Sequence, residues 1–194
     1  MSGHTPLGLL LIGCFALTTR AEGVADMATA GAFNGLPNVK IEYYDVGGID
    51  EASINASLQA TAPRRPNGGT AMGLTTYNFK YSTVPAKHGS VCTVERAIVE
   101  FTSTVHLPRL VNETSVPERI MVRWRPFIEG LRLHEAGHVR IENDHLKDIK
   151  AALVGVRCDQ VQSAFNAAAN RVGALQKVYD LQTNDGATQG AVLR

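Results

Sequence analysis

The stretch that decides the fold of this chain is "LRLHEAGHVRIENDHLKD", residues 131–148. It contains the pattern His-Glu-x-x-His, at His134, Glu135 and His138. In a helix, residues four apart lie on one face about 6 Å apart along the axis, so both imidazoles can point at one metal ion. Glu135 is rotated away from them and can take a proton from a water molecule that the metal activates. The pattern predicts a helix that carries two zinc ligands and a general base.

The surrounding sequence extends this helix and adds a second one. Apolar residues and histidines recur every three or four positions, which predicts one continuous helix over residues 117–155. A second stretch with the same period covers residues 158–179. A short link would join the two as an antiparallel hairpin, which sets Tyr179 beside His134. Gly137 weakens the first helix relative to alanine, so we expect another backbone or a substrate to approach closely there.

The first half of the chain has the pattern of strands with one short helix. Residue types and alternation predict three strands, at residues 39–46, 74–84 and 91–110. The last two are joined by a turn at residues 85–90. Ile54 and Leu58, at helical spacing, predict a short helix after the first strand. The expected fold is therefore α+β: a small, mostly antiparallel sheet with a short helix, followed by the long His-Glu-x-x-His helix and an antiparallel C-terminal helix.

The N-terminal stretch differs from the rest of the chain. "PLGLLLIGCFALTT", residues 6–19, is apolar but too short to span a bilayer, and small residues follow it. We divide the chain into an export signal at residues 1–21, a linker rich in Ala and Gly at residues 22–38, and one domain at residues 39–194. Cleavage after Ala21 and lipidation of Cys14 are both open. The protein is expected to be exported, periplasmic or secreted, and to contact a membrane only if Cys14 is lipidated.

Charge and cysteine content narrow the expected partners and compartment. The 194 residues include 19 Lys and Arg and 18 Asp and Glu, giving a net charge of +1. No run of like charges stands out, so we expect no nucleic-acid partner. Cys92 and Cys158 form an even pair, which in an exported protein predicts a disulfide. Such a bridge can stabilise the fold by about 4 kcal/mol.

Five features of the chain together resemble a known family. They are "YYDVGG", "CTVERAIVEFTSTVHLP", "LRLHEAGHVRI", the second cysteine of the pair and "VYDLQTNDGATQGAVL", and they extend over residues 39–193. In these features the chain is similar to the DUF922 family of predicted bacterial secreted zinc-dependent proteases, part of the wider zincin group. The resemblance implies a zincin-like fold, a zinc ion, export and peptidase activity. It implies no particular substrate.

A catalytic zinc normally takes three protein ligands, so one is still to be found. Glu142 and His145 lie near the right face, but a straight helix places them roughly 6 and 10 Å past His138. The family pattern near the C-terminus resembles Tyr-Asp-x-x-Thr-x-His-Gly, with a histidine where this chain has Asp185. The order of candidates is Asp185, Asp180, Glu142 and His145. An ordinary Asn-Asp-Gly turn is the other explanation for Asp185.

These observations predict an exported zinc-dependent metallopeptidase that hydrolyses a peptide or amide bond, with Glu135 as general base. The expected zinc ligands are His134, His138 and Asp185. Tyr179 either stabilises a tetrahedral intermediate or fills the interface between the helices. The expected substrate is a peptide, a protein or peptidoglycan. The alternative is a catalytically degenerate zincin that serves as a periplasmic binding or envelope-scaffold module, because Asp185 replaces a histidine.

Overall fold

The computed structural model describes residues 31–65 and 68–193. Its strands are β1 (Val39–Val46), β2 (Leu74–His88) and β3 (Val91–Leu110). Its α-helices are α2 (Glu51–Thr61), α3 (Glu118–Asp144), α4 (Leu146–Leu153) and α5 (Val161–Thr183). Short 3-10 helices lie at η1 (Glu113–Ser115), η2 (Cys158–Gln160) and η3 (Ala187–Gln189). The α+β class is confirmed.

The predicted export signal, including Cys14, lies outside the described residues. Within them, no helix has both the length and the apolar character needed to cross a membrane. Part of the predicted linker is described, and it does not behave as a linker. Phe33 is only 7% exposed and belongs to the core, and Arg140 on α3 donates a hydrogen bond to the Ala32 carbonyl at 2.8 Å. The packed unit therefore begins before residue 39, because burial of the Phe33 ring ties this segment to the sheet and helices.

The sheet has the strand order β1-β3-β2 and is mixed rather than mostly antiparallel. β1 pairs with β3 in parallel, from Val39 opposite Ser103 to Val46 opposite Leu110. β2 pairs with β3 in antiparallel register over the whole length of β2, from Leu74 opposite His106 to His88 opposite Val91. The parallel pair is possible because α2 and β2 lie between β1 and β3 in sequence and return the chain to the same end of the sheet.

The hairpin between β2 and β3 is longer than predicted. β2 continues to His88, so only Gly89 and Ser90 form the turn. Gly89 has φ +65°, which glycine adopts without strain. The register shifts between Val84 and Pro85, where proline has no N–H to donate to the ladder. The predicted turn at residues 85–90 is therefore wrong in extent, since the proline produces a bulge instead of ending the strand.

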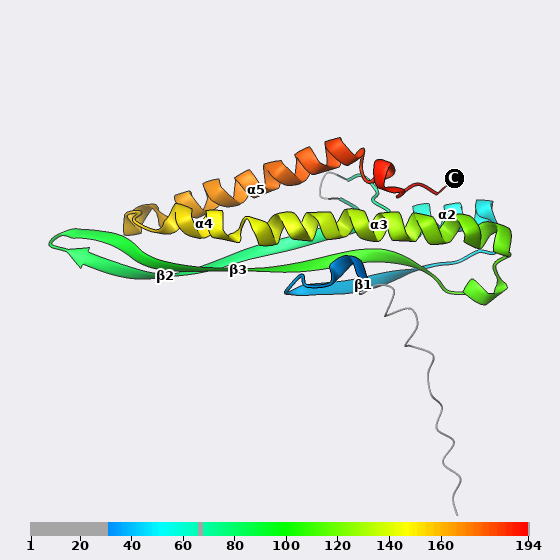
Figure 1. Cartoon of the computed structure of the whole chain (residues 1–194), viewed down its shortest axis with the longest axis horizontal. Helices are drawn as coiled ribbons and strands as arrows, with labels where there is room; N and C mark the ends of the chain where they lie inside the picture. The colour runs from blue at the N-terminus through cyan, green and yellow to red at the C-terminus, as the bar shows by residue number, and fades with distance from the viewer. Residues whose placement is uncertain (1–30, 66–67, 194) are drawn as a thin grey trace, which may run out of the picture.

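The helices cover one face of the sheet. Figure 1 shows α3 and α4 lying along that face, with α5 running back beside them. On β3, Phe101, Val105 and Leu107 are each 1% exposed or less, and they pack in one cluster with Phe127 and Val139 of α3. This alternation along β3 and the three-to-four spacing along α3 are the patterns of half-buried elements. The hairpin of helices expected from the sequence is present.

The helix predicted over residues 117–155 is interrupted. At His145 the backbone has φ −98° and ψ 4°, so α3 ends at Asp144 and α4 begins at Leu146. The His145 side chain contacts Asp148 at 2.6 Å, which supports the first turn of α4. The prediction of one continuous helix is wrong at this point, because the apolar stripe continues across a break at His145, and α4 follows α3 end to end along the sheet (Figure 1).

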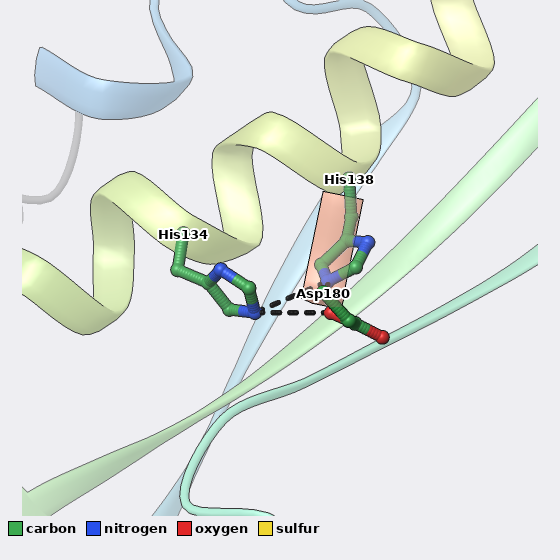
Figure 2. Close-up of side chains that lie close together, drawn as sticks. All are labelled: His134, His138 and Asp180. Carbon is green, nitrogen blue, oxygen red and sulfur yellow. Dashed lines mark hydrogen bonds and ion pairs between the residues drawn. The ribbon is translucent and has the colours of Figure 1, made fainter. Parts of the chain in front are cut away.

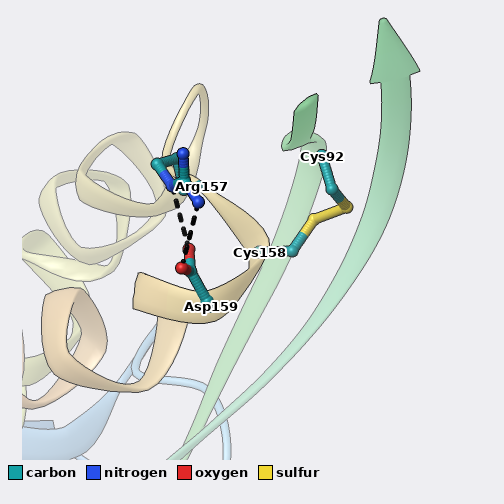
Figure 3. Close-up of a disulfide and its surroundings, with 4 residues drawn as sticks. All are labelled: Cys92, Arg157, Cys158 and Asp159. Atoms are coloured by element: carbon teal, nitrogen blue, oxygen red, sulfur yellow. Dashed lines mark hydrogen bonds and ion pairs between the residues drawn. A yellow bond between two sulfur atoms is a disulfide. The ribbon is translucent and has the colours of Figure 1, made fainter. Parts of the chain in front are cut away.

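A disulfide joins Cys92 to Cys158, with the two Cα atoms 5.5 Å apart. Cys92 lies near the tip of the β2-β3 hairpin, and Cys158 lies in the link between α4 and α5 (Figure 3). Backbone hydrogen bonds reinforce this joint: the Val94 N–H donates to the Val156 carbonyl at 2.9 Å, and the Gly155 N–H donates to the Val94 carbonyl at 2.8 Å. The predicted disulfide is confirmed, and it fastens the far end of the sheet to the start of α5.

Candidate metal centre

Two histidines of α3 and one aspartate of α5 converge on a single point (Figure 2). The Nε2 atoms of His134 and His138 lie 3.2 Å apart. The Oδ1 atom of Asp180 lies 3.4 Å from the first and 3.0 Å from the second. A tetrahedral zinc with bonds of about 2.0 to 2.1 Å places its ligand atoms about 3.3 Å from one another. The three side chains therefore have the spacing of a zinc site.

The outer nitrogen of each imidazole faces an amide oxygen. His138 Nδ1 lies 2.7 Å from Gln176 Oε1, and His134 Nδ1 lies 3.1 Å from Gln189 Oε1. The Gln176 amide is oriented by its nitrogen, which donates to the His138 carbonyl at 3.1 Å and to Glu142 Oε1 at 3.2 Å. An amide oxygen can only accept, so each Nδ1 carries a proton and each Nε2 presents its lone pair to Asp180.

Asp180 completes the group of three side chains, and its carboxylate faces both Nε2 atoms. Its Oδ1 atom is buried and has no conventional hydrogen-bond partner within the described part of the chain. Burial raises the pKa of this carboxyl, but the contacts with His134 and His138 outweigh it and hold the pKa below its usual value. For His138, burial lowers the pKa, and its contacts with Asp180 and Glu135 raise it above the ordinary value. An ionised carboxylate between two imidazole lone pairs is an arrangement that a cation satisfies.

Glu135 lies beside the three ligands and is held by the start of β2. Its side chain is 3% exposed. The Thr75 hydroxyl donates to Glu135 Oε2 at 2.7 Å, and a Cβ added to Gly73 would lie 2.4 Å from Oε1. Burial raises the pKa of Glu135, and the Thr75 hydrogen bond partly offsets this. The strand thus fixes the orientation of a dry carboxylate that can accept a proton.

Tyr179 lies at the interface between α3 and α5. Its ring stacks on His134, with centroids 5.2 Å apart and planes 11° apart. Its hydroxyl donates to the His134 carbonyl at 3.2 Å and accepts from Gln189 Nε2 at 3.0 Å. A Cβ on Gly137 would lie 2.0 Å from that hydroxyl. The close approach expected at Gly137 is thus made by a side chain, Tyr179, and not by a backbone or a substrate. Tyr179 fills the interface between the helices, and its action on a tetrahedral intermediate stays a prediction.

The structure corrects the third ligand. Asp185 is exposed and pairs with Arg65, whose Nη2 atom lies 2.9 Å from its Oδ1. α5 ends at Thr183, and Asn184 and Asp185, both with φ +50°, form a left-handed turn in which the Asp185 side chain meets Arg65 and not the histidines. Asp180 is still inside α5, on the side that faces the histidines. The choice of Asp185 before Asp180 is therefore wrong, because the turn explanation holds for Asp185.

The two lower-ranked candidates have other partners. Glu142 is fully buried behind His138, where it accepts hydrogen bonds from Ser103 and Gln176. Burial raises the pKa of Glu142 to about 7. His145 pairs with Asp148. Neither candidate belongs to the group of metal-ligating side chains in the described residues.

The sequence prediction missed the residues that support the ligands. Gln176 had a signal: the antiparallel register that sets Tyr179 beside His134 also sets a residue near 175 beside His138. Thr75 and Gly73 had no such signal in the sequence, because nothing near the start of β2 indicates that Glu135 packs against this segment.

An open cleft of about 600 Å³ gives access to the centre. Its walls come from the start of β2, from α3 and from α5, and they include all three metal ligands and Glu135. Two cationic side chains, Arg65 and Lys177, also line it. The cleft is large enough to hold a few residues of an extended chain or a small ligand.

Comparison with known proteins places this chain in a family. A family model described as "Bacterial protein of unknown function (DUF922)" matches residues 41–187. A search of curated proteins found no match, and a search of solved structures found none either. The matched region contains the two histidines, Glu135 and Asp180. The chain belongs to the DUF922 family of bacterial proteins of unknown function.

Proposed function

We propose that this protein is a zinc-dependent hydrolase of peptide or amide bonds. One observation carries the proposal: three potential metal-ligand atoms, contributed by His134, His138 and Asp180, converge beside the buried carboxylate of Glu135. Three protein ligands with an open fourth direction are the mark of a catalytic zinc rather than a structural one. The cleft supplies that open direction.

Each side chain of the centre has a task that follows from its contacts. A zinc ion bound there would acidify a water molecule and polarise the carbonyl of the substrate. Glu135 would accept the proton and return it to the leaving amine. Thr75 and Gly73 hold the Glu135 carboxylate in one orientation. Gln176 and Gln189 keep the protons of the imidazoles on Nδ1, so that both Nε2 atoms can bind metal.

The identity of the metal is part of the proposal. Two histidines and one carboxylate also form the facial triad of non-haem iron enzymes, so the donors alone admit iron. Glu135 favours zinc, because a buried carboxylate next to the ligands serves hydrolysis. Metal analysis of protein purified without added metal should find about one zinc per chain. One equivalent of iron with no zinc would contradict the proposal.

The decisive variant is Glu135→Gln, which keeps the size of the side chain and removes the base. Loss of a general base lowers hydrolysis by about 100- to 10,000-fold, while the zinc content should stay that of the wild type. Cleavage is measured on a library of short peptides and on peptidoglycan fragments. Glu129→Gln, on the same helix but outside the cleft, is the matched control. Wild-type rates in Glu135→Gln would rule out the mechanism.

The alternative of a binding or envelope-scaffold module depended on Asp185 in place of a histidine. Asp180 now provides the third acceptor, which removes that reason without testing the function. The same experiment separates the two, since a binding module would hold metal and cleave nothing in the library.

We further propose a zincin-like fold and export. The motif helix α3 packed on a small sheet supports the first, and the Cys92–Cys158 disulfide supports the second, because such bonds persist in oxidising compartments. Fractionation of the native host, with a test for lipid on Cys14, distinguishes periplasm, membrane and medium.

A further inference from the structure

The charged side chains that line the cleft differ in whether they are free to meet a substrate. Glu135 accepts from Thr75, and Glu142 accepts from Ser103 and Gln176. The third acidic group, Asp180, lies between the two histidines. The acidic groups of the cleft are therefore all engaged by the protein's own side chains or by the metal centre.

The two cations of the cleft are not equivalent. Arg65 is neutralised by Asp185, 2.9 Å away. Lys177 is exposed, and among the described residues its side chain has no hydrogen bond or ion pair. Lysine has a compact charge on a flexible stem, so it can turn toward a ligand at little cost. Lys177 is thus the cation of the cleft that is available to an incoming anion.

Its place on α5 puts Lys177 next to the metal ligands. Lys177 and Asp180 are three residues apart, which sets them on neighbouring turns of one face, about 4.5 Å apart along the axis. Gln176, the preceding residue, reaches His138. An anion on Lys177 would therefore lie in the same cleft as a bond held at the metal.

We propose that Lys177 binds a carboxylate of the substrate, and that the cleft selects peptides with an acidic group next to the cleaved bond. The carboxylate is either the C-terminus of a peptide or the side chain of an Asp or Glu. This inference rests on the proposed hydrolase function, and it names the class of substrate for it. A lysine that meets a carboxylate in a cleft gains a charge-assisted hydrogen bond, which is stronger than a neutral one.

Binding provides a test that needs no turnover. Succinic acid monohydroxamate carries a metal-binding group and a carboxylate, and its amide lacks only the charge. Zinc-loaded wild-type protein should bind the acid about tenfold more tightly than the amide, as expected for one hydrogen bond to a charged group. Lys177→Met should bind the two equally. Lys150→Met, an exposed lysine of α4 outside the cleft, should keep the wild-type preference. An undiminished preference in Lys177→Met, or none in the wild type, overturns the inference.

Cleavage assays separate this inference from the proposed function. Peptides are compared in two pairs. In the first pair a free C-terminus is compared with a C-terminal amide, and in the second an internal Glu is compared with Gln. In one of the two pairs, the wild type should have a higher kcat/KM on the acidic peptide than on its neutral counterpart, which identifies the source of the carboxylate. Lys177→Met should lose that difference. Cleavage of all forms at equal rates defeats the inference and leaves the hydrolase in place. Cleavage of none defeats the proposed function, whatever the hydroxamates show.

Discussion

Asp180 and Asp185 are five residues apart in sequence, yet only Asp180 reaches the histidines. The difference comes from the end of α5. Helical geometry holds Asp180 toward α3, whereas Asn184 and Asp185 lie in the left-handed turn after the helix, where the Asp185 side chain pairs with Arg65. At the scale of single residues, the identity of a ligand depends on where a helix stops, and a family pattern that aligns side-chain types does not record this.

We predict that Asp180→Ala lowers the zinc content far below one per chain, because two imidazoles alone bind zinc weakly. Asp185→Ala is the matched control and should retain zinc, since it loses only an exposed ion pair with Arg65. Metal content after dialysis against a weak chelator measures both. Full zinc in Asp180→Ala, with loss in Asp185→Ala, would restore Asp185 as the ligand.

Glu142 gives a prediction about pH. Its pKa is raised by burial from 4.5 to about 7, so folding favours the protonated form. The stability from this group is complete below about pH 4.5 and is lost as the pH rises through 7. In metal-free wild-type protein, this group should lower the unfolding free energy by about 2 kcal/mol between pH 5 and pH 8. In Glu142→Gln this contribution to the decline should be absent. Urea titrations at both pH values measure it, and an equal decline in the variant would contradict the assignment.

At the scale of elements, α5 is the part on which the centre depends most. It contributes Asp180 and Gln176, and it is anchored at both ends. The disulfide and the backbone bonds of the α4-α5 link hold its start. At its other end, η3 returns against α3, where a Cβ on Gly130 would lie 2.3 Å from the Gly190 carbonyl carbon. The close contact at these two glycines lets Gln189 reach His134.

Replacing both Cys92 and Cys158 by serine should lower the unfolding free energy by about 4 kcal/mol, as expected for a bridge across 66 residues. Zinc content should be unchanged, since Asp180 lies about 30 Å further along α5. Thermal melts with and without reductant provide the control, because reductant should affect the wild type and leave the variant as it is. A variant as stable as the oxidised wild type would show that the bridge contributes nothing.

Elements with local signals were predicted well. The strand at residues 39–46 and the helix with Ile54 and Leu58 on its buried side are confirmed. Features set by tertiary contacts were not: the parallel pairing of β1, the break at His145 and the packing of Phe33. The same division applies to the candidate site. A five-residue motif brings His134 and His138 together. Asp180 and Thr75 come from separate elements, and their positions depend on where a helix ends and where a strand lies, which no local pattern encodes.

At the scale of the whole molecule, the centre exists only when the sheet and both long helices are packed. The candidate ligands come from α3 and α5, and the start of β2 holds Glu135. An ion that binds such a site binds the folded chain and not the unfolded one, so its binding energy adds to stability.

Zinc at 100 times its dissociation constant should therefore raise the unfolding free energy by about 2.7 kcal/mol. The melting temperature of wild-type protein should fall on treatment with EDTA and recover with added zinc. The melting temperature of Asp180→Ala should not change with zinc, whereas that of Asp185→Ala should change as much as in the wild type. If the melting temperature of the wild type is the same with and without zinc, the three side chains hold no zinc ion.

The separation of the ligands along the chain also has a consequence for synthesis. His134 and His138 leave the ribosome dozens of residues before Asp180, and at about 5–20 residues per second this is a delay of several seconds. During that time the nascent chain has the two imidazoles and Glu135, and no helix α5 to pack against them. On the proposed function, a chain built in this order gains its activity only after Asp180 has been added, so the cell that produces it is not exposed to that activity while the metal centre is incomplete.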